Sequence, residues 1–145
     1  MKIAVVGLGY VGLPLSLQFA RVGVEVIGLD VDQKKADALN AGESYIEHIE
    51  ASDIAEAVKK GIFKASVDFS KISEAEAAII CVPTPLNKNR EPDISYIVET
   101  GKSIAPHMAK GCLVVLESTT YPGTTREELL PLLESRGMKK PERWF

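Results

Sequence analysis

The chain begins with an apolar run that leads directly into a glycine pattern. Residues 2–6 read as a buried strand, and Gly7, Gly9 and Gly12 follow in the spacing GxGxxG. In such a pattern the first glycine permits a tight turn, the second lets a diphosphate approach the backbone, and the third lets the next helix pack closely on the sheet. Free N–H groups at the start of that helix face the anion. The pattern therefore predicts a dinucleotide-binding turn.

The residues that follow the glycines complete a strand–helix–strand unit. Residues 11–22 carry apolar side chains at helical spacing, and residues 24–29 read as a second strand. Asp30 comes directly after this strand. Its carboxylate is suited to accept hydrogen bonds from a ribose diol and would repel a 2′-phosphate, which favours NAD over NADP. The alternative is a tight strand-to-helix turn that binds no ligand.

Composition restricts the class of protein. The 145 residues suit one domain of ordinary size, and 46% hydrophobic residues are enough to fill a core. A net charge of −3 argues against a surface that binds nucleic acid or acidic lipid. No apolar run approaches the roughly 20 residues of a membrane span, and a strand stands where a signal peptide would lie. We therefore expect a cytoplasmic protein.

Helices and strands are expected to alternate along the rest of the chain. Asp93 is the expected N-cap of one helix, and Pro131 would kink the last helix unless that helix starts later. The expected helices span residues 32–39, 52–60, 93–108 and 124–135, and the expected strands span residues 62–67, 78–82 and 113–116, with a brief turn ending at 74–77.

Such alternation requires a parallel sheet that is covered on both faces. We therefore predict an α/β fold of the Rossmann type, a doubly wound parallel sheet with strand order near 3-2-1-4-5. A single domain is expected over residues 1–137, closed by Gly137 and followed by a tail over residues 138–145. Ligands on such a sheet bind beyond the carboxyl ends of the strands, where the strand order reverses.

Two further loops, at Pro83 and at Ser118, are expected beside the glycine turn at this edge. Thr84 could donate a hydrogen bond to a phosphate or ribose, or could simply be hydrated. Lys35 could reach the adenosine half of a dinucleotide, although a hydrated surface lysine is the default. Five hydroxyls suit a nicotinamide or a substrate oxygen, while helix capping would explain one or two of them. They belong to Ser118, Thr119, Thr120, Thr124 and Thr125.

The sequence offers little chemistry beyond binding. Cys81 and Cys112 lie among apolar residues and are expected to be buried thiols rather than a disulfide. His48 and His107 lie apart from them, so no metal site is expected. We identify no convincing nucleophile and no second domain that could close a cleft over a substrate.

Five segments that occur in order along the chain carry a family resemblance. They are GLGYVGLPLS from Gly7, Asp30 with Lys35, ICVPTPLN from Ile80, EPDISYI from Glu91 and LESTTYPGTT from Leu116. Together they resemble the N-terminal NAD-binding domain of the UDP-glucose/GDP-mannose dehydrogenase family. The segments SYIEHI and VPTPLNKNREPD are most similar to the UDP-N-acetylglucosamine 6-dehydrogenase branch of that family.

The resemblance implies a two-step oxidation of the C6 alcohol of a UDP-sugar to the carboxylate, with reduction of two NAD. The reaction would pass through an aldehyde and a thioester on a catalytic cysteine. By position, Thr119 corresponds to a threonine near the reacting carbon and is the one catalytic candidate. The implied cofactor contacts are Gly7, Leu8, Gly9, Tyr10, Val11, Gly12, Asp30, Lys35, Thr84 and Thr125.

The same resemblance sets limits on this chain. The family's cysteine, its substrate-binding lysine and asparagine, and its central and substrate domains belong to sequence beyond residue 145, so we expect NAD binding without complete oxidation. A homodimer of the full-length enzyme is possible. Where relatives read Ser-Thr-x-Pro-Val-Gly, residues 118–123 read STTYPG, which shifts the proline and bears on the position of Thr125.

Two other interpretations stay open from the sequence. One is a non-catalytic module that senses a dinucleotide or supports assembly. The other is the NAD domain of a dehydrogenase of the 3-hydroxyacid type, which the VPTP and STT segments disfavour.

Overall fold

The first strand, helix and strand form around the glycine turn. In the computed structural model, which describes residues 1–88 and 90–135, β1 (Lys2–Val6) ends at the turn, α1 (Gly12–Arg21) follows it, and β2 (Glu25–Leu29) returns parallel to β1. Gly7 has a φ of 93°, in the left-handed region that glycine adopts without steric penalty. The expected strand–helix–strand unit is therefore present.

The strands lie side by side in one twisted parallel sheet. Within the described residues, the sheet has five strands in the order β3-β2-β1-β4-β5. The doubly wound fold and the strand order expected from the sequence are confirmed. The remaining elements are α2 (Gln33–Asn40), α3 (Ala51–Lys59), β3 (Phe63–Ser66), the 3₁₀ helix η1 (Phe69–Glu74), β4 (Ala77–Ile80), α4 (Ser95–Ile104), β5 (Leu113–Leu116), the π-helix η2 (Thr125–Leu129) and α5 (Leu130–Glu134).

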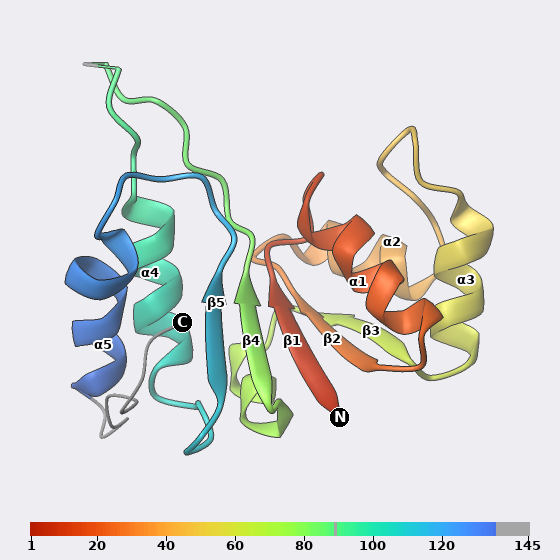
Figure 1. The fold of residues 1–145 in the computed structure, drawn as a ribbon. Coiled ribbons are helices and arrows are strands. Elements are labelled where there is room, and N and C mark those ends of the chain that lie inside the picture. Colours follow the sequence, from red (N-terminus) through yellow and green to blue (C-terminus); the bar gives the residue numbers. More distant parts are fainter. Residues whose placement is uncertain (89, 136–145) are drawn as a thin grey trace.

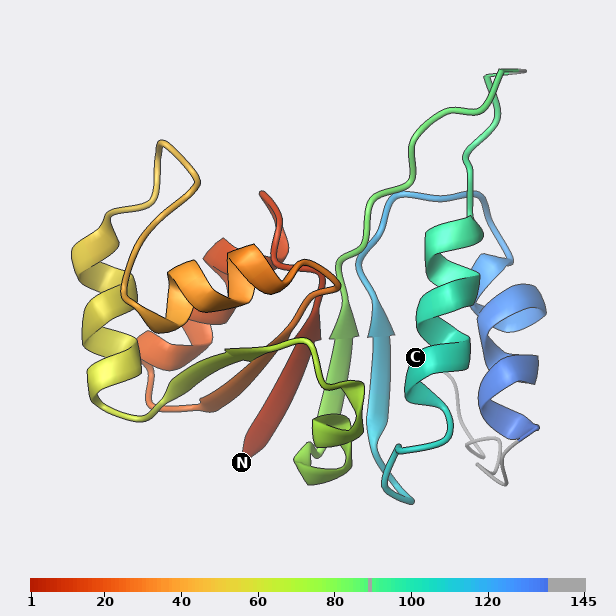
Figure 2. The same ribbon diagram turned by 180° about the vertical axis from the view of Figure 1, so that it is seen from behind.

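Helices cover both faces of the sheet (Figure 1). Successive strand residues point to opposite faces, so Ile3 and Val5 pack beneath α1, α2 and α3, whereas Ala4 and Val6 pack against η1, α4 and α5. Figure 2 shows α4 and α5 next to each other on the second face. The two apolar cores hold the twisted sheet between the helix layers and so position the edge at which the strands end.

Several boundaries differ from the expected ones for identifiable reasons. β4 stops at Ile80 because its partner β1 stops at Val6, the residue in register with Ile80. α4 ends at Ile104 rather than near residue 108, because Pro106 has no N–H with which to continue the helical hydrogen bonds. This helix begins at Ser95, and the Asp93 carboxylate accepts a hydrogen bond from the Ser95 N–H at 3.0 Å.

The proline in the last helix is accommodated by a change of helix type. Residues 125–129 form a π-helix, and α5 begins at Leu130, so Pro131 lies in its first turn. A proline in a first turn removes an N–H that has no partner inside its own helix. The single helix expected over 124–135, with a kink at Pro131 unless it started later, is thus two segments that meet between Leu129 and Leu130. Gly137 and the expected tail lie outside the described residues.

The outer edge of β3 is partly closed by a side chain. The Asn40 amide donates to the carbonyl of Ala65 and accepts from the Ala65 N–H, both at 2.9 Å. The pair of bonds takes the place of a neighbouring strand at this residue. It ties the end of α2 to the sheet and blocks pairing with another chain at that point.

Replacing Asn40 by alanine is expected to lower the free energy of unfolding by about 1 to 2 kcal/mol, because both polar groups of Ala65 lose their partner. Asn40→Asp keeps an acceptor for the N–H and is expected to lose less. Urea unfolding followed by circular dichroism measures both. An Asn40→Ala variant as stable as the original chain would show that water replaces the amide at no cost.

Among the described residues, no helix combines the length and the apolar character that crossing a membrane requires.

Candidate functional site

A cavity of about 520 Å³ opens beyond the carboxyl ends of β1, β2, β4 and β5. It lies where the strand order reverses between β1 and β4, which is the position at which open α/β sheets bind ligands. Its volume is within the range of small-molecule and cofactor sites. Of the residues singled out in the sequence, it is lined by Gly7, Gly9, Tyr10, Val11, Asp30, Lys35, Thr84, Ser118 and Thr119.

The glycine turn forms one wall, and each glycine meets a different environment. A Cβ on Gly12 would lie 1.8 Å from the carbonyl oxygen of Gly7, so the turn and the start of α1 touch through bare backbone. A Cβ on Gly9 would have no protein atom within 4 Å. Gly9 lines the cavity, so the space beside its backbone is open to a ligand. This open approach is the one a diphosphate requires.

Asp30 stands at the end of β2 with its carboxylate held in place. The side chain is 7% exposed and accepts hydrogen bonds from the backbone N–H of Leu8 at 2.9 Å and of Asp32 at 3.1 Å. The Lys35 ammonium lies 3.7 Å from the same oxygen that Leu8 contacts. A carboxylate has about four acceptor positions, so capacity remains for the hydroxyls of a ribose.

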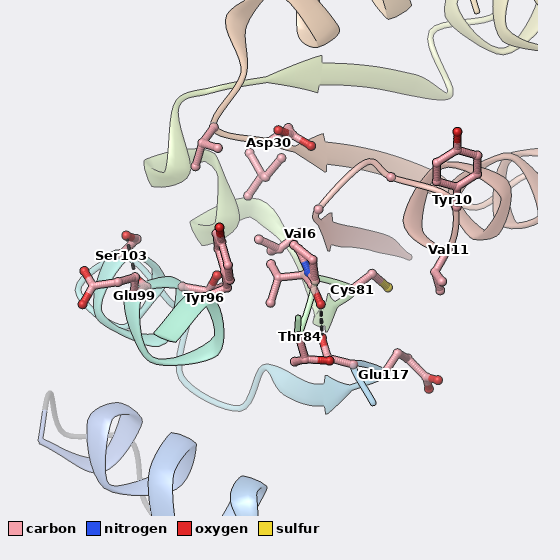
Figure 3. A pocket seen from close by; sticks show the side chains of 18 of the residues that line it. Val6, Tyr10, Val11, Asp30, Cys81, Thr84, Tyr96, Glu99, Ser103 and Glu117 are labelled. Carbon is pink, nitrogen blue, oxygen red and sulfur yellow. Dashed lines mark hydrogen bonds between the residues drawn. The ribbon is translucent and has the colours of Figure 1, made fainter. Parts of the chain in front are cut away.

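Tyr10 and Val11 project into solvent at the rim. They are 80% and 57% exposed, which is high for large side chains with apolar surface. Figure 3 shows them across the cavity from Tyr96 and Glu99. Their neighbour Leu8 is fully buried and does not line the cavity.

The loops after β4 and β5 are bonded to each other. The Thr84 hydroxyl donates to the backbone carbonyl of Thr119, and the Ser118 hydroxyl donates to the carbonyl of Val82 at 2.7 Å. The structure thus brings Thr84 and Thr119 together at one end of the cavity. The proton of the Thr84 hydroxyl is used within the protein, and its oxygen keeps acceptor capacity.

The two threonines at the start of η2 differ in placement. Thr124 is 1% exposed, and its hydroxyl donates to the carbonyl of Tyr121 at 2.9 Å and lies 2.8 Å from the hydroxyl of Thr120. Thr125 is exposed and does not line the cavity. The five hydroxyls expected around this loop are therefore not gathered in one place: Ser118 and Thr119 line the cavity, Thr120 and Thr124 are bonded to each other, and Thr125 is exposed.

The opposite wall was not anticipated from the sequence. α4 contributes Tyr96, Glu99, Thr100 and Ser103, and η1 contributes Phe69. The four α4 residues have the spacing i, i+3, i+4, i+7, so they share one face of the helix. From the sequence, this spacing indicates that the four side chains share one helix face. Only the packing of α4 on the sheet shows that this face points toward the strand ends.

The cysteines are free thiols, as expected. Cys81 lines the cavity, and burial, with a smaller effect from Glu117, raises the pKa of its thiol to about 11. Burial also raises the pKa of the Cys112 thiol, although this residue is only partly buried. A protonated thiol is a poor nucleophile, so Cys81 contributes apolar surface to the site. In the described part of the chain, no group of three or more His, Cys, Asp or Glu side chains is arranged to hold a metal ion.

Comparison with known proteins decides the family. Residues 1–143 match the NAD binding domain of the UDP-glucose/GDP-mannose dehydrogenase family. The chain belongs to this family. It is 42% identical over 135 residues to the UDP-N-acetyl-D-mannosamine dehydrogenase of Escherichia coli K12, a match that covers 92% of this chain and 31% of the relative.

Two further matches agree with this placement. The chain is 34% identical over 146 residues to the UDP-N-acetyl-D-glucosamine 6-dehydrogenase of Pseudomonas aeruginosa, covering 100% of this chain and 34% of that protein. The crystal structure of a ternary complex of GDP-mannose dehydrogenase from Pseudomonas aeruginosa superposes with a TM-score of 0.88 at 33% identity, covering 97% of this chain and 33% of that one. The chain spans about a third of the length of these relatives.

Membership in the family confirms NAD as the cofactor of this domain. The cavity fits that cofactor, because an open glycine backbone and a fixed carboxylate line the same space.

Proposed function

We propose that this chain supplies the NAD site of a dehydrogenase that oxidises the C6 alcohol of a UDP-linked N-acetylhexosamine to the carboxylate, with UDP-N-acetylglucosamine as the favoured substrate. The observation that carries the proposal is that one cavity joins the glycine turn and Asp30 to the loops of Thr84 and Thr119. The names of the two curated relatives described above support the sugar class, because both contain a UDP-linked N-acetylhexosamine.

Each lining residue has a role that its geometry supports. When bound, NAD supplies the hydride acceptor. The Asp30 carboxylate would accept ribose hydroxyls, and Lys35 lies beside it as a compensating charge. Tyr10 and Val11 would cover the cofactor with exposed apolar surface.

The remaining candidates lie toward the β4 and β5 loops. Thr84 would accept a hydrogen bond from the cofactor through the lone pairs left on its hydroxyl. Thr119, exposed and lining the cavity, is the candidate for contact with the reacting part of the substrate. For Thr125, which does not line the cavity, the support is the family resemblance alone.

The complete oxidation requires groups that this chain does not carry. We propose that a catalytic cysteine and the residues that hold the sugar come from further sequence, since the chain spans about a third of the relatives it matches. We further propose that the protein works in the cytoplasm and that the full-length enzyme forms a homodimer.

Asp30→Ala tests the cofactor part of this function. The original chain is expected to bind NAD and to exclude NADP, because the Asp30 carboxylate repels a 2′-phosphate. The variant is expected to lose about 1 to 3 kcal/mol of NAD affinity, a rise in Kd of about five- to 150-fold, because charged hydrogen bonds are lost. Isothermal titration calorimetry measures both ligands.

Asp37→Ala is the matched control, since it removes an exposed carboxylate of α2 that, among the residues the structure describes, bonds only to Gln33. This control is expected to bind NAD like the original chain. A lack of NAD binding by the original chain, or tighter binding of NADP than of NAD, would overturn the proposed function.

A further inference from the structure

The loop between α2 and α3 places a tyrosine hydroxyl against the glycine turn. The Tyr45 hydroxyl donates a hydrogen bond to the backbone carbonyl of Leu8 at 2.5 Å, across 37 residues of sequence. The next residue, Ile46, is 6% exposed and packs in the core beneath α1 to α3. The Ser44 hydroxyl bonds to the backbone N–H and carbonyl of Ile46. The loop is therefore anchored on both sides of Tyr45.

Both backbone polar groups of Leu8 are held by side chains from other parts of the chain. Its N–H donates to Asp30, and its carbonyl accepts from Tyr45. Its own side chain is fully buried, so the residue has no freedom to rotate as a unit. Tyr45 and Asp30 thus act on the same residue from opposite ends of its backbone.

The restraint on the Leu8 carbonyl also restrains the Gly9 N–H, because both groups belong to the same planar peptide. In a trans peptide the carbonyl of one residue and the N–H of the next point in opposite directions. Because the Leu8 carbonyl points at Tyr45, the Gly9 N–H points away from it. Gly9 lines the cavity and Tyr45 does not. In the described part of the chain, the Gly9 N–H donates to no protein group.

We propose that Tyr45 is a positioning residue of the NAD site, which holds the Leu8–Gly9 peptide so that the Gly9 N–H is directed at the cofactor diphosphate. The inference rests on the proposed function and adds to it a residue that does not line the cavity. A donor that is held in place before binding loses less conformational entropy when the anion binds.

The surroundings of Tyr45 keep its hydroxyl a donor. Burial, together with the nearby charges of Asp30 and Asp32, raises the pKa of the Tyr45 phenol above its ordinary value. The Lys35 ammonium lies 5.7 Å from the centre of the Tyr45 ring, within range of a cation–π contact. The ring thus also restrains the lysine beside Asp30.

Tyr45→Phe removes the hydroxyl and leaves the ring over Lys35. We expect the Kd for ADP-ribose, which carries the diphosphate, to rise about three- to tenfold, the effect of one hydrogen bond. The Kd for adenosine, which carries no phosphate, is expected to stay unchanged in an NMR titration. A loss of structure alone would weaken both ligands. Tyr121→Phe, on a loop residue that does not line the cavity, is the matched control and is expected to bind both ligands normally.

A second measurement needs no ligand. In ¹⁵N spectra of the free chain, the Gly9 amide is expected to shift and to gain mobility in Tyr45→Phe but not in Tyr121→Phe. An unchanged Gly9 amide, or an unchanged Kd for ADP-ribose, would overturn the inference. If the original chain failed to bind ADP-ribose, the proposed function would fail instead, and the Gly9 amide would still decide whether Tyr45 holds the peptide.

Discussion

Gly12→Ala is expected to lower the free energy of unfolding by about 3 kcal/mol or more, a large part of the stability of a domain of this size. The added Cβ would lie 1.8 Å from the Gly7 carbonyl oxygen and 3.2 Å from the Cβ of Cys81. A Cβ has no rotamer that could avoid these atoms, because the backbone alone sets its position. Relief requires α1 to move away from β1, which opens the core around Leu13 and Leu17.

Urea unfolding followed by circular dichroism measures this loss, and Gly23→Ala is its matched control. Gly23, in the turn after α1, has a φ of 82°, yet a Cβ there would meet no atom within 4 Å. Its replacement is expected to cost about 1 kcal/mol, from backbone conformation alone. If Gly12→Ala destabilised the chain no more than Gly23→Ala does, the close contact between the turn and α1 would not be a constraint on the fold.

Gly9→Ala is expected to have the opposite profile, with NAD affinity reduced about a hundredfold or more and stability nearly unchanged. A Cβ on Gly9 meets no protein atom within 4 Å, and the residue does not adopt a left-handed φ. The added methyl group would instead stand in the cavity, where the cofactor diphosphate is expected to approach the backbone. The penalty therefore arises only in the complex.

Two measurements on Gly9→Ala separate these effects. Calorimetry with NAD gives the affinity, and urea unfolding without ligand gives the stability. Adenosine, which has no diphosphate, serves as the control ligand and is expected to bind both forms alike. NAD affinity equal to that of the original chain would contradict the assignment of Gly9 to the diphosphate. A large loss of stability would contradict the open space beside this residue.

Much of the fold follows from constraints between residues close in sequence. The glycine spacing and the apolar runs predict the first strand, helix and strand, and the alternation after them predicts the strand order. The errors have two causes. β4 ends where its partner strand, distant in sequence, ends. The π-helix before Pro131 changes the type of a helix whose position was expected.

The candidate site also has some features that the local sequence sets and others that only the packing sets. The sequence by itself determined the glycine turn, Asp30 and the three strand-to-helix loops, because steric limits on glycine and the end of a strand are local properties. Only the tertiary structure decided that α4 forms the facing wall, that Thr124 turns inward while Thr125 does not, and that Tyr45 bonds to Leu8. These contacts depend on how helices pack on the sheet, and packing joins residues that no local pattern relates.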